Sequence, residues 1–226
     1  MRTKTTSTLA AVVVATIALL AQSPGVHPIS GRQFAGVMGY QGAAWLDREE
    51  RDVEEAPDRA LDAIRIEKGS TVADVGAGSG YMTIRMARRV GPEGRVYATD
   101  IQPQMLAMLR ERLQKERITN VTPVQGAVDD PRLPPDTLDL ILLVDVYHEF
   151  SQPQQMLRGM RAALKPGGRL VLLEYKKEDP SIPIRLEHKM TVAEAKLEVE
   201  AEGFRLARVG NELPRQHILV FEKPKP

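Results

Sequence analysis

The chain contains no cysteine among its 226 residues. This absence excludes disulfides, thiolate metal sites and a cysteine nucleophile, and it leaves the redox compartment undecided. An excess of either charge is also lacking, because 31 Lys and Arg stand against 30 Asp and Glu, for a net charge of +1. A chain without a strongly basic field is not expected to bind nucleic acid, so a small-molecule partner is the natural expectation.

A hydrophobic run long enough to cross a membrane is missing as well. Arg2 and Lys4 precede an apolar stretch from Leu9 to Ala21, which is shorter than the ~20 residues of a membrane-spanning helix. Residues 1–30 are therefore expected to be a secretory signal peptide or an N-terminal anchor, and no stable membrane span is expected. A signal would make the protein periplasmic or secreted, and a cytoplasmic or membrane-anchored protein is the alternative.

The rest of the chain divides into a helical lead-in or lid, residues 31–57, and a main domain, residues 58–226. The lead-in contains a dense charge run from Asp47 to Ala56. Such a run is most often the solvated face of a helix, and we expect that here. A helix is then expected from Arg59 to Ile66, because Pro57 and Asp58 offer a helix start.

Short β-branched runs alternate with amphipathic helical segments from Thr71 onward, which is typical of parallel strands joined by crossover helices. The expected strands are Thr71 to Val75, Arg95 to Asp100, Val121 to Gln125, Leu138 to Val144, Arg169 to Glu174, Phe204 to Val209 and His217 to Glu222. The expected helices are Tyr81 to Val90, Pro103 to Glu116, Gln152 to Leu164 and Thr191 to Ala201.

The connection before the last expected strand, Gly210 to Gln216, is too short for a crossover helix, so that strand should run antiparallel. The sequence therefore predicts an α/β fold of the Rossmann-like, doubly wound type. Its sheet should have seven strands, mostly parallel with the last strand antiparallel, and helices on both faces.

A glycine-rich turn, Asp74-Val75-Gly76-Ala77-Gly78-Ser79-Gly80, joins the first expected strand to the following helix. Glycines let the chain turn tightly and let a ligand approach the backbone, while the helix directs free amide groups at the same space. The dinucleotide fingerprint would need glycine at Tyr81, and no Gly-Lys-Ser or Gly-Lys-Thr follows. The spacing therefore disfavours a nicotinamide oxidoreductase and a P-loop nucleotidase.

Asp100 ends the second expected strand, twenty residues beyond Gly80. A carboxylate at that strand end can accept hydrogen bonds from both hydroxyls of a ribose bound across the glycine turn. The turn and Asp100 together therefore predict a site for a nucleoside-containing cofactor.

Three segments resemble motifs of the class I S-adenosylmethionine-dependent methyltransferases, in the order in which that family has them: Val72 to Tyr81, Val96 to Asp100 and Leu164 to Leu170. The resemblance covers roughly residues 58 to 222 and implies S-adenosylmethionine as the cofactor. It also implies that Gly76, Gly78 and Gly80 pack against the methionine and ribose portions, that Asp100 holds the ribose and that Ile101 contacts the adenine. Further candidates for cofactor binding are Asp74, Ala77, Asp129 and Asp145.

The acceptor is expected at the carboxyl ends of the strands, where ligands bind in open parallel sheets. Asp145, Tyr147 and His148 follow the fourth expected strand and are the candidate catalytic residues. Candidates for substrate contact, chosen for their place at this rim or in the lid, are Tyr40, Trp45, Glu149, Glu174, His188 and His217.

His148 is the first choice for a general base, because histidine has an unperturbed pKa of about 6.5 and a protonated acceptor must lose its proton. The alternative is that His148 or Tyr147 only orders its loop. His148, Glu149, His188 and His217 could also form a metal site, but they lack a tight ligand spacing, so no metal is predicted.

These observations predict a methyltransferase that moves a methyl group from S-adenosylmethionine to a small-molecule acceptor. The alternative is a non-catalytic S-adenosylmethionine-binding protein of the cell envelope. It is kept because a signal peptide would separate the domain from a methyl donor made in the cytoplasm.

Overall fold

The structure is a computed structural model that describes residues 25–225. Most of the expected signal peptide or anchor, residues 1–30, therefore lies outside the described residues. Within residues 25–225, no helix has the length and apolar character needed to span a membrane.

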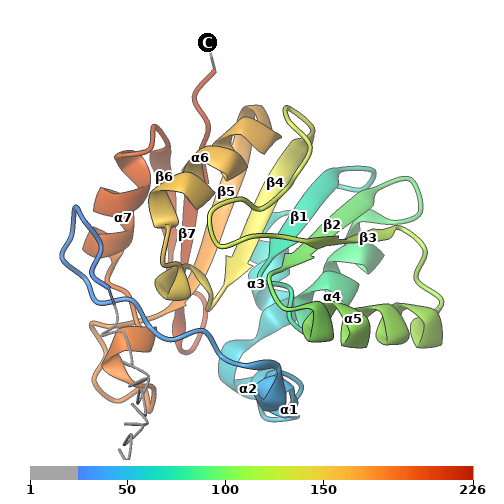
Figure 1. The fold of residues 1–226 in the computed structure, drawn as a ribbon, viewed down its shortest axis with the longest axis horizontal. Coiled ribbons are helices and arrows are strands. Elements are labelled where there is room, and N and C mark those ends of the chain that lie inside the picture. The colour runs from blue at the N-terminus through green and yellow to red at the C-terminus, as the bar shows by residue number, and fades with distance from the viewer. Residues whose placement is uncertain (1–24, 226) are drawn as a thin grey trace, which may run out of the picture.

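A seven-stranded sheet forms the centre of the molecule (Figure 1). Its order is β3-β2-β1-β4-β5-β7-β6. β7 runs antiparallel to both of its neighbours, and the other paired strands are parallel. The strands are β1 (Thr71–Val75), β2 (Arg95–Asp100), β3 (Val121–Gln125), β4 (Leu138–Val144), β5 (Leu164–Tyr175), β6 (Arg205–Gly210) and β7 (Gln216–Glu222). The predicted fold class is confirmed.

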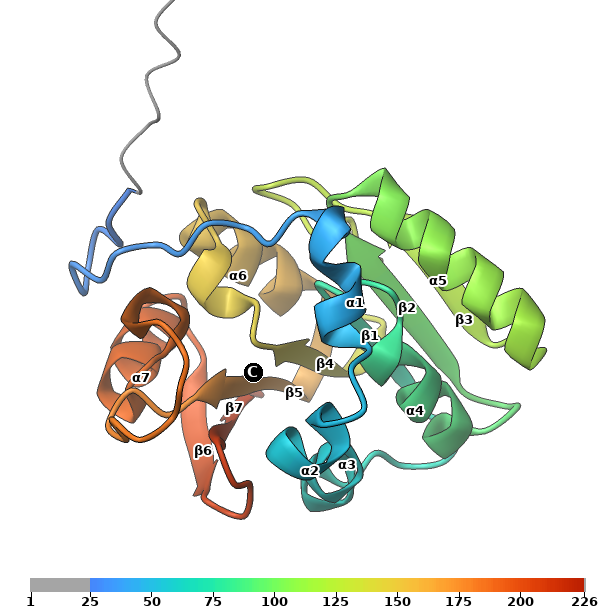
Figure 2. The same ribbon diagram turned by 90° about the horizontal axis from the view of Figure 1, so that it is seen from below.

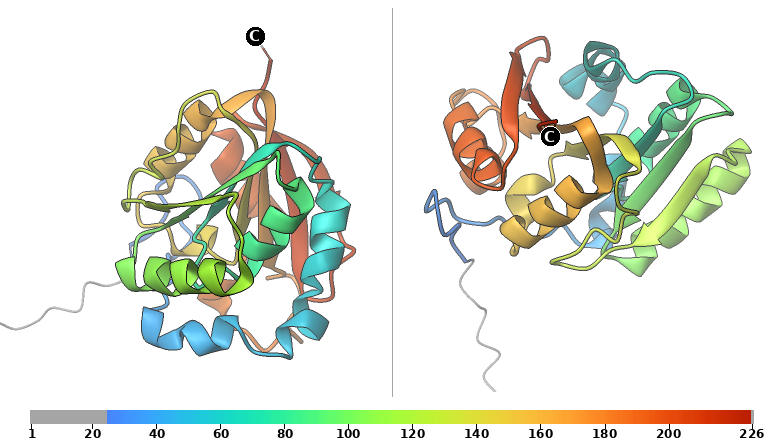
Figure 3. Two further views of the ribbon diagram at one scale, coloured as in Figure 1. Left: turned by 90° about the vertical axis from the view of Figure 1, so that its right-hand side faces the viewer. Right: turned by 90° about the horizontal axis from the view of Figure 1, so that it is seen from above.

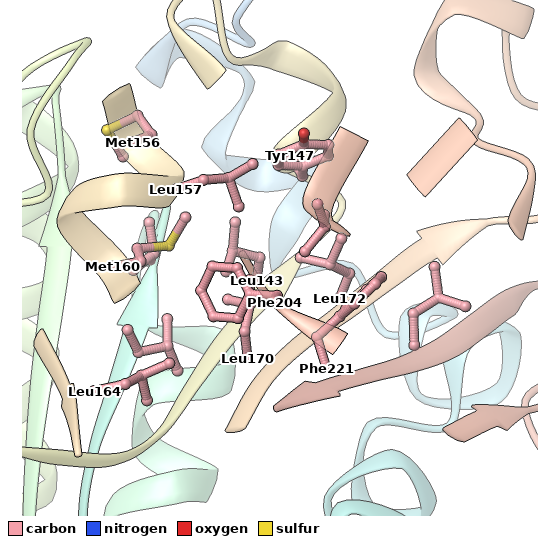
Figure 4. Packing of buried hydrophobic residues seen from close by; sticks show 14 of the residues in the cluster. Leu143, Tyr147, Met156, Leu157, Met160, Leu164, Leu170, Leu172, Phe204 and Phe221 are labelled. Carbon is pink, nitrogen blue, oxygen red and sulfur yellow. The ribbon is translucent and has the colours of Figure 1, made fainter. Parts of the chain in front are cut away.

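Helices cover both faces of the sheet (Figure 2). They are α3 (Pro57–Ile64), α4 (Tyr81–Val90), α5 (Pro103–Glu116), α6 (Pro153–Ala163) and α7 (Val192–Glu200). β4 shows why two faces are needed, because successive side chains of a strand point to opposite sides. Ile141 and Leu143 pack in the core under α6 and α7, whereas Leu140 and Leu142 pack against α3 and α4. Figure 4 shows the first of these cores around Leu143 and Leu172.

The bounds of α3 and β5 differ most from the expected ones, whereas the other expected elements agree to within one residue at each end. α3 begins at Pro57 rather than at residue 59, because proline is well placed in a first helical turn, and it ends where Arg65 adopts a left-handed conformation with φ 51°. β5 begins at Leu164, five residues before the expected strand, because Leu164 already pairs with Leu138 of β4.

The lead-in crosses the carboxyl ends of the strands. It contains η1 (Tyr40–Gly42), α1 (Ala43–Leu46) and α2 (Arg51–Glu55), and α1 and α2 lie beyond that edge of the sheet in Figures 1 and 3. Residues 25–39, called the strap below, run from the side of α7 past α6 to α1 (Figure 2). A helical lead-in or lid was expected at residues 31–57, and a lid function for this segment stays a prediction.

A buried ion pair fastens the strap to α7. Arg32 donates from Nε and Nη2 to the two carboxylate oxygens of Glu198, at 3.0 and 2.9 Å. Ser30 donates its hydroxyl to the same carboxylate at 2.5 Å, and both charged side chains are buried. Because a buried carboxylate without a cation is costly, this pair fixes where the strap can lie.

We expect Arg32→Met to destabilise the fold by about 3 kcal/mol, because it leaves Glu198 as a buried charge without its cation. Urea unfolding of the two proteins measures the difference. Arg205→Met is the matched control, since Arg205 pairs with Glu222 on the surface and exposed pairs contribute about 0–1 kcal/mol. Equal losses in the two variants would show that the buried pair does not hold the strap.

Candidate functional site

The glycine turn has a backbone that only glycine adopts readily. Gly76, Gly78 and Gly80 have φ angles of 75°, 54° and 93°. A Cβ atom on Gly76 would lie 2.4 Å from Cγ2 of Val146, and one on Gly78 would lie 2.8 Å from Cδ1 of Leu46. The turn therefore has no room for side chains and leaves its backbone open to a ligand.

Asp100 is bound to the glycine turn directly. Its Oδ2 atom accepts a hydrogen bond from the amide of Gly78 at 2.9 Å, and its Oδ1 atom accepts one from the amide of Gln102 at 2.8 Å. Burial raises the pKa of Asp100, and the backbone donors oppose that rise. A carboxylate has about four lone-pair positions, so two remain for ribose hydroxyls.

A pocket opens between the turn, Asp100 and the end of β4. Its empty volume, including space that is open to solvent, is about 840 Å³. The sequence-predicted residues that line it are Gly76, Gly78, Asp100, Ile101, Asp145 and Glu149. Val37 and Met38 of the strap and Leu46 of α1 also line it, so the lead-in forms one wall.

Asp145 lines this pocket and has one carboxylate oxygen without a hydrogen-bond partner among the described residues. The residue directly follows β4 and has a left-handed backbone, with φ 52°. Its Oδ2 atom accepts a hydrogen bond from Gln216 at 2.7 Å, whereas Oδ1 is buried without a partner within residues 25–225. Burial raises the pKa of Asp145, and the negative charges of Glu55 and Glu174 raise it further. A cationic ligand group would satisfy this oxygen.

Four other predicted cofactor residues do not line the pocket. Asp74 is buried at the end of β1 and accepts a hydrogen bond from the Thr83 hydroxyl at 2.5 Å, and burial raises its pKa to about 6. Ala77 and Gly80 belong to the glycine turn but do not line the pocket. Asp129 is exposed on the loop after β3, while the neighbouring Ala127 and Val128 line the pocket. Asp74 therefore ties α4 to β1 rather than facing the ligand space.

His148 lies in a buried polar chain next to Glu149, which lines the pocket. It belongs to η2 (Tyr147–Glu149), and its Nδ1 atom lies 2.6 Å from Oε2 of Glu174. Its Nε2 atom lies 3.1 Å from Nδ1 of His188, in η3 (Leu186–His188). His148 is 2% exposed, so both of its ring nitrogens are engaged away from solvent.

Glu149 is the member of this group that reaches the pocket. One of its oxygens accepts a hydrogen bond from the amide of Met38 in the strap at 3.3 Å. Burial raises the pKa of Glu149 to about 7, while burial and the neighbouring His148 lower the pKa of His188. The group therefore joins two imidazoles and a carboxylate at the edge of the cofactor pocket.

The remaining predicted residues lie elsewhere. Tyr147 points into the core with Leu157 and Leu143 (Figure 4). His217 pairs with Glu178 at 2.8 Å, outside the His148 chain. Tyr40 and Trp45 do not line the pocket, and Trp45 is 52% exposed under the guanidinium of Arg48, 3.8 Å from its ring centre.

The charge run of the lead-in is solvated over most of its length, as expected, with Asp47, Glu49, Glu50 and Asp52 exposed, but Arg51 and Glu55 depart from that expectation. In α2, Arg51 and Glu55 are 5% and 3% exposed, whereas Val53 between them is 82% exposed. Arg51 Nε donates to Glu55 at 2.7 Å, and the Tyr175 hydroxyl donates to the same carboxylate at 2.8 Å. The pair is buried because it meets the polar end of β5. The only local signal for this ion pair in the sequence was that Arg51 and Glu55 are four residues apart.

The sheet order, the glycine turn and Asp100 define a Rossmann-like domain of the kind that binds nucleoside cofactors at the carboxyl ends of its strands. Residues 72–168 match the family model described as a methyltransferase domain. The solved S-adenosylmethionine-dependent methyltransferase from Aquifex aeolicus is 28% identical with a TM-score of 0.77, and the match covers 82% of this chain and 98% of that one. Over these residues the chain resembles the class I S-adenosylmethionine-dependent methyltransferases.

Two further similarities bear on its function. The ubiquinone/menaquinone biosynthesis C-methyltransferase UbiE from Enterobacter sp. strain 638 is 36% identical over 118 residues, which are 52% of this chain and 47% of the relative. The chain thus spans about half the length of the curated relatives it matches. The solved cyclase SpnF shares the fold with a TM-score of 0.65 and 16% identity, over 88% of this chain and 90% of that one.

We expect Gly76→Ala to weaken the binding of S-adenosylhomocysteine at least about tenfold, or ~1.4 kcal/mol. The added methyl would strain the turn and push Val146 at the pocket wall. Isothermal titration calorimetry measures the affinity. Gly69→Ala is the matched control, because Gly69 also has a positive φ, 78°, but open space around it. If both variants keep the parent affinity, the turn does not shape the cofactor site.

Proposed function

We propose that the protein is an enzyme that transfers a methyl group from S-adenosylmethionine to a small-molecule acceptor. The observation that carries this proposal is the pocket that Gly76, Gly78, Asp100 and Asp145 line together, with Asp100 hydrogen-bonded to the glycine turn. When bound, S-adenosylmethionine supplies a methyl group on a positively charged sulfur, which an acceptor can displace directly.

Each side of the pocket suits one part of that cofactor. Asp100 would accept hydrogen bonds from the ribose hydroxyls, and the backbone of Gly76 and Gly78 would contact the ligand without an intervening Cβ. Ile101 is 37% exposed at the pocket and would cover one face of the adenine. The free Oδ1 atom of Asp145 would accept a hydrogen bond from the cationic amino group of the methionine portion. This last bond would also neutralise a buried carboxylate.

The acceptor would lie beside Glu149, where the cofactor pocket meets the His148 chain. The sequence suggested His148 as a free base, but its ring nitrogens face Glu174 and His188. We therefore propose that His148 acts on the acceptor through its neighbours, as a positioning residue. The strap would cover this side, since Met38 binds Glu149 and lines the pocket.

A small organic acceptor with an apolar part fits the lining best. Many of the lining side chains are apolar, among them Val37, Leu46, Val128 and Phe150. The match to UbiE, which is named as a C-methyltransferase of quinone biosynthesis, supports an organic acceptor of this kind. The fold by itself does not decide the reaction, because one fold hosts many chemistries, and the similarity to a cyclase illustrates this.

We expect Asp100→Ala to weaken S-adenosylhomocysteine binding by about 1 to 3 kcal/mol, the usual cost of leaving buried polar groups unpaired. The ribose hydroxyls and the amide of Gly78 would lose their acceptor. Calorimetric titration measures the change. Asp62→Ala, at an exposed position on α3, should bind as the parent does. An unchanged affinity for Asp100→Ala would mean that the ribose lies elsewhere.

We expect acceptor-dependent formation of S-adenosylhomocysteine when the protein is incubated with S-adenosylmethionine and a panel of small organic acceptors. His148→Ala should lower that rate about a hundredfold while keeping the cofactor affinity, since loss of a positioning residue that misplaces the acceptor by about 1 Å can have this effect. Mass spectrometry of both products measures the rate. Tight cofactor binding with no turnover on any acceptor of the panel would instead favour the non-catalytic binding protein.

A further inference from the structure

We propose that His148, Glu149 and His188 bind one divalent transition-metal ion at the edge of the cofactor pocket. One potential ligand atom from each of the three side chains lies within 4.8 Å of the other two. The two histidines are forty residues apart in the chain and meet only because η2 and η3 pack together. Their convergence therefore comes from the fold and not from a local sequence pattern.

Glu174, the hydrogen-bond partner of His148, determines which ring nitrogen of His148 can bind a metal. The carboxylate of Glu174 accepts hydrogen bonds from the Tyr147 amide at 3.0 Å and from His148 Nδ1 at 2.6 Å. Nδ1 is therefore the donor, and Nε2 keeps its lone pair and points at His188. A histidine whose second nitrogen donates to a carboxylate is the usual arrangement at protein metal sites, where it sets the tautomer and ring orientation.

The spacing of the donors suits an ion. His148 Nε2 and His188 Nδ1 are 3.1 Å apart, close to the ~3.3 Å between two nitrogens that each lie ~2.0 Å from a tetrahedral zinc. The carboxylate of Glu149 completes the set from the pocket side. Without an ion, the same distance is a hydrogen bond between two imidazoles, which is the competing explanation.

The backbone around all three ligands is held in place. The carbonyl of His148 accepts hydrogen bonds from the Ala35 amide and from Arg32 Nη1, both at 3.1 Å. Close to His188, the amide of Met190 donates to the carbonyl of Tyr175 at 3.0 Å, and Lys189 donates to the carbonyl of Ile182 at 2.7 Å. A preorganised ligand set of this kind costs little to arrange when an ion binds.

Two imidazoles and one carboxylate suit ions such as Zn²⁺, Co²⁺ or Fe²⁺ rather than Ca²⁺ or Mg²⁺. Three protein ligands also leave at least one coordination position open, as catalytic metal sites do. That position would face the pocket beside Glu149. On the proposed function, an open position there identifies the acceptor class as a molecule with a metal-binding donor atom close to the atom that takes the methyl group.

Binding of Zn²⁺ and Co²⁺ to the metal-stripped protein tests the site without any turnover. We expect one ion per chain by calorimetry with Zn²⁺, and a visible absorption band with Co²⁺ that Zn²⁺ abolishes. His188→Gln and Glu149→Gln should each weaken Zn²⁺ binding at least about tenfold, and Glu174→Gln should weaken it about 10–100-fold through the orientation of His148. His217→Gln is the matched control, because His217 pairs with Glu178 outside the cluster, and it should bind as the parent does.

Absence of Zn²⁺ binding, or binding that all three cluster variants leave unchanged, would overturn the metal site. Thermal melting establishes that each variant is folded, and Glu149→Gln decides the matter if His188→Gln does not fold. S-adenosylhomocysteine affinity is measured on the same samples. A protein that binds the nucleoside but no ion would contradict only the metal site, whereas one that binds the ion but no nucleoside would contradict only the proposed function.

Discussion

The candidate site depends on one short contact, the hydrogen bond from the Gly78 amide to the carboxylate of Asp100 at 2.9 Å. The parallel register of β1 and β2, which pairs Val75 with Thr99, brings the two strand ends to the same level. The amides of Gly76 and Ala77 then bind the Thr99 carbonyl, at 2.8 and 3.0 Å. The turn can approach the second strand this closely because it carries no bulky side chain there.

The same edge of the sheet collects four carboxylates that are buried or half-buried. Asp100, Asp145, Glu149 and Glu174 all follow or end parallel strands, and the charge of each is expensive to bury. Arg51 and Arg32 of the lead-in are buried as well, but each forms its ion pair with another carboxylate, Glu55 and Glu198 respectively. The lead-in thus adds two buried arginines to the structure without pairing the four carboxylates at the sheet edge.

The sheet could be predicted from the sequence because its signals are local. Apolar runs such as Leu138 to Val144, and the glycines that follow β1, specify strands and turns within a few residues. The seven expected strands are all present, and the antiparallel last strand followed from the short connection before it. Boundaries shifted where tertiary pairing extended an element, as at Leu164.

The candidate site was harder to predict because it depends on contacts between distant segments. The sequence identified Asp100, Asp145 and Glu149, which line the pocket, since each follows a strand at the ligand-binding edge. It did not reveal that Tyr147 points into the core while His148 points to Glu174. The two residues are adjacent in one short helical turn, and the sequence does not show in which direction each side chain of such a turn points. The burial of Arg51 and the contact between His148 and His188 also had no local signal.

The most direct test of this account is a crystal structure of the protein with S-adenosylhomocysteine. We expect both ribose hydroxyls to lie within about 3.0 Å of the Asp100 carboxylate, the usual range of such hydrogen bonds, with the adenine against Ile101. A nucleoside bound at any other part of the sheet, or a glycine turn closed over by side chains in the complex, would contradict it.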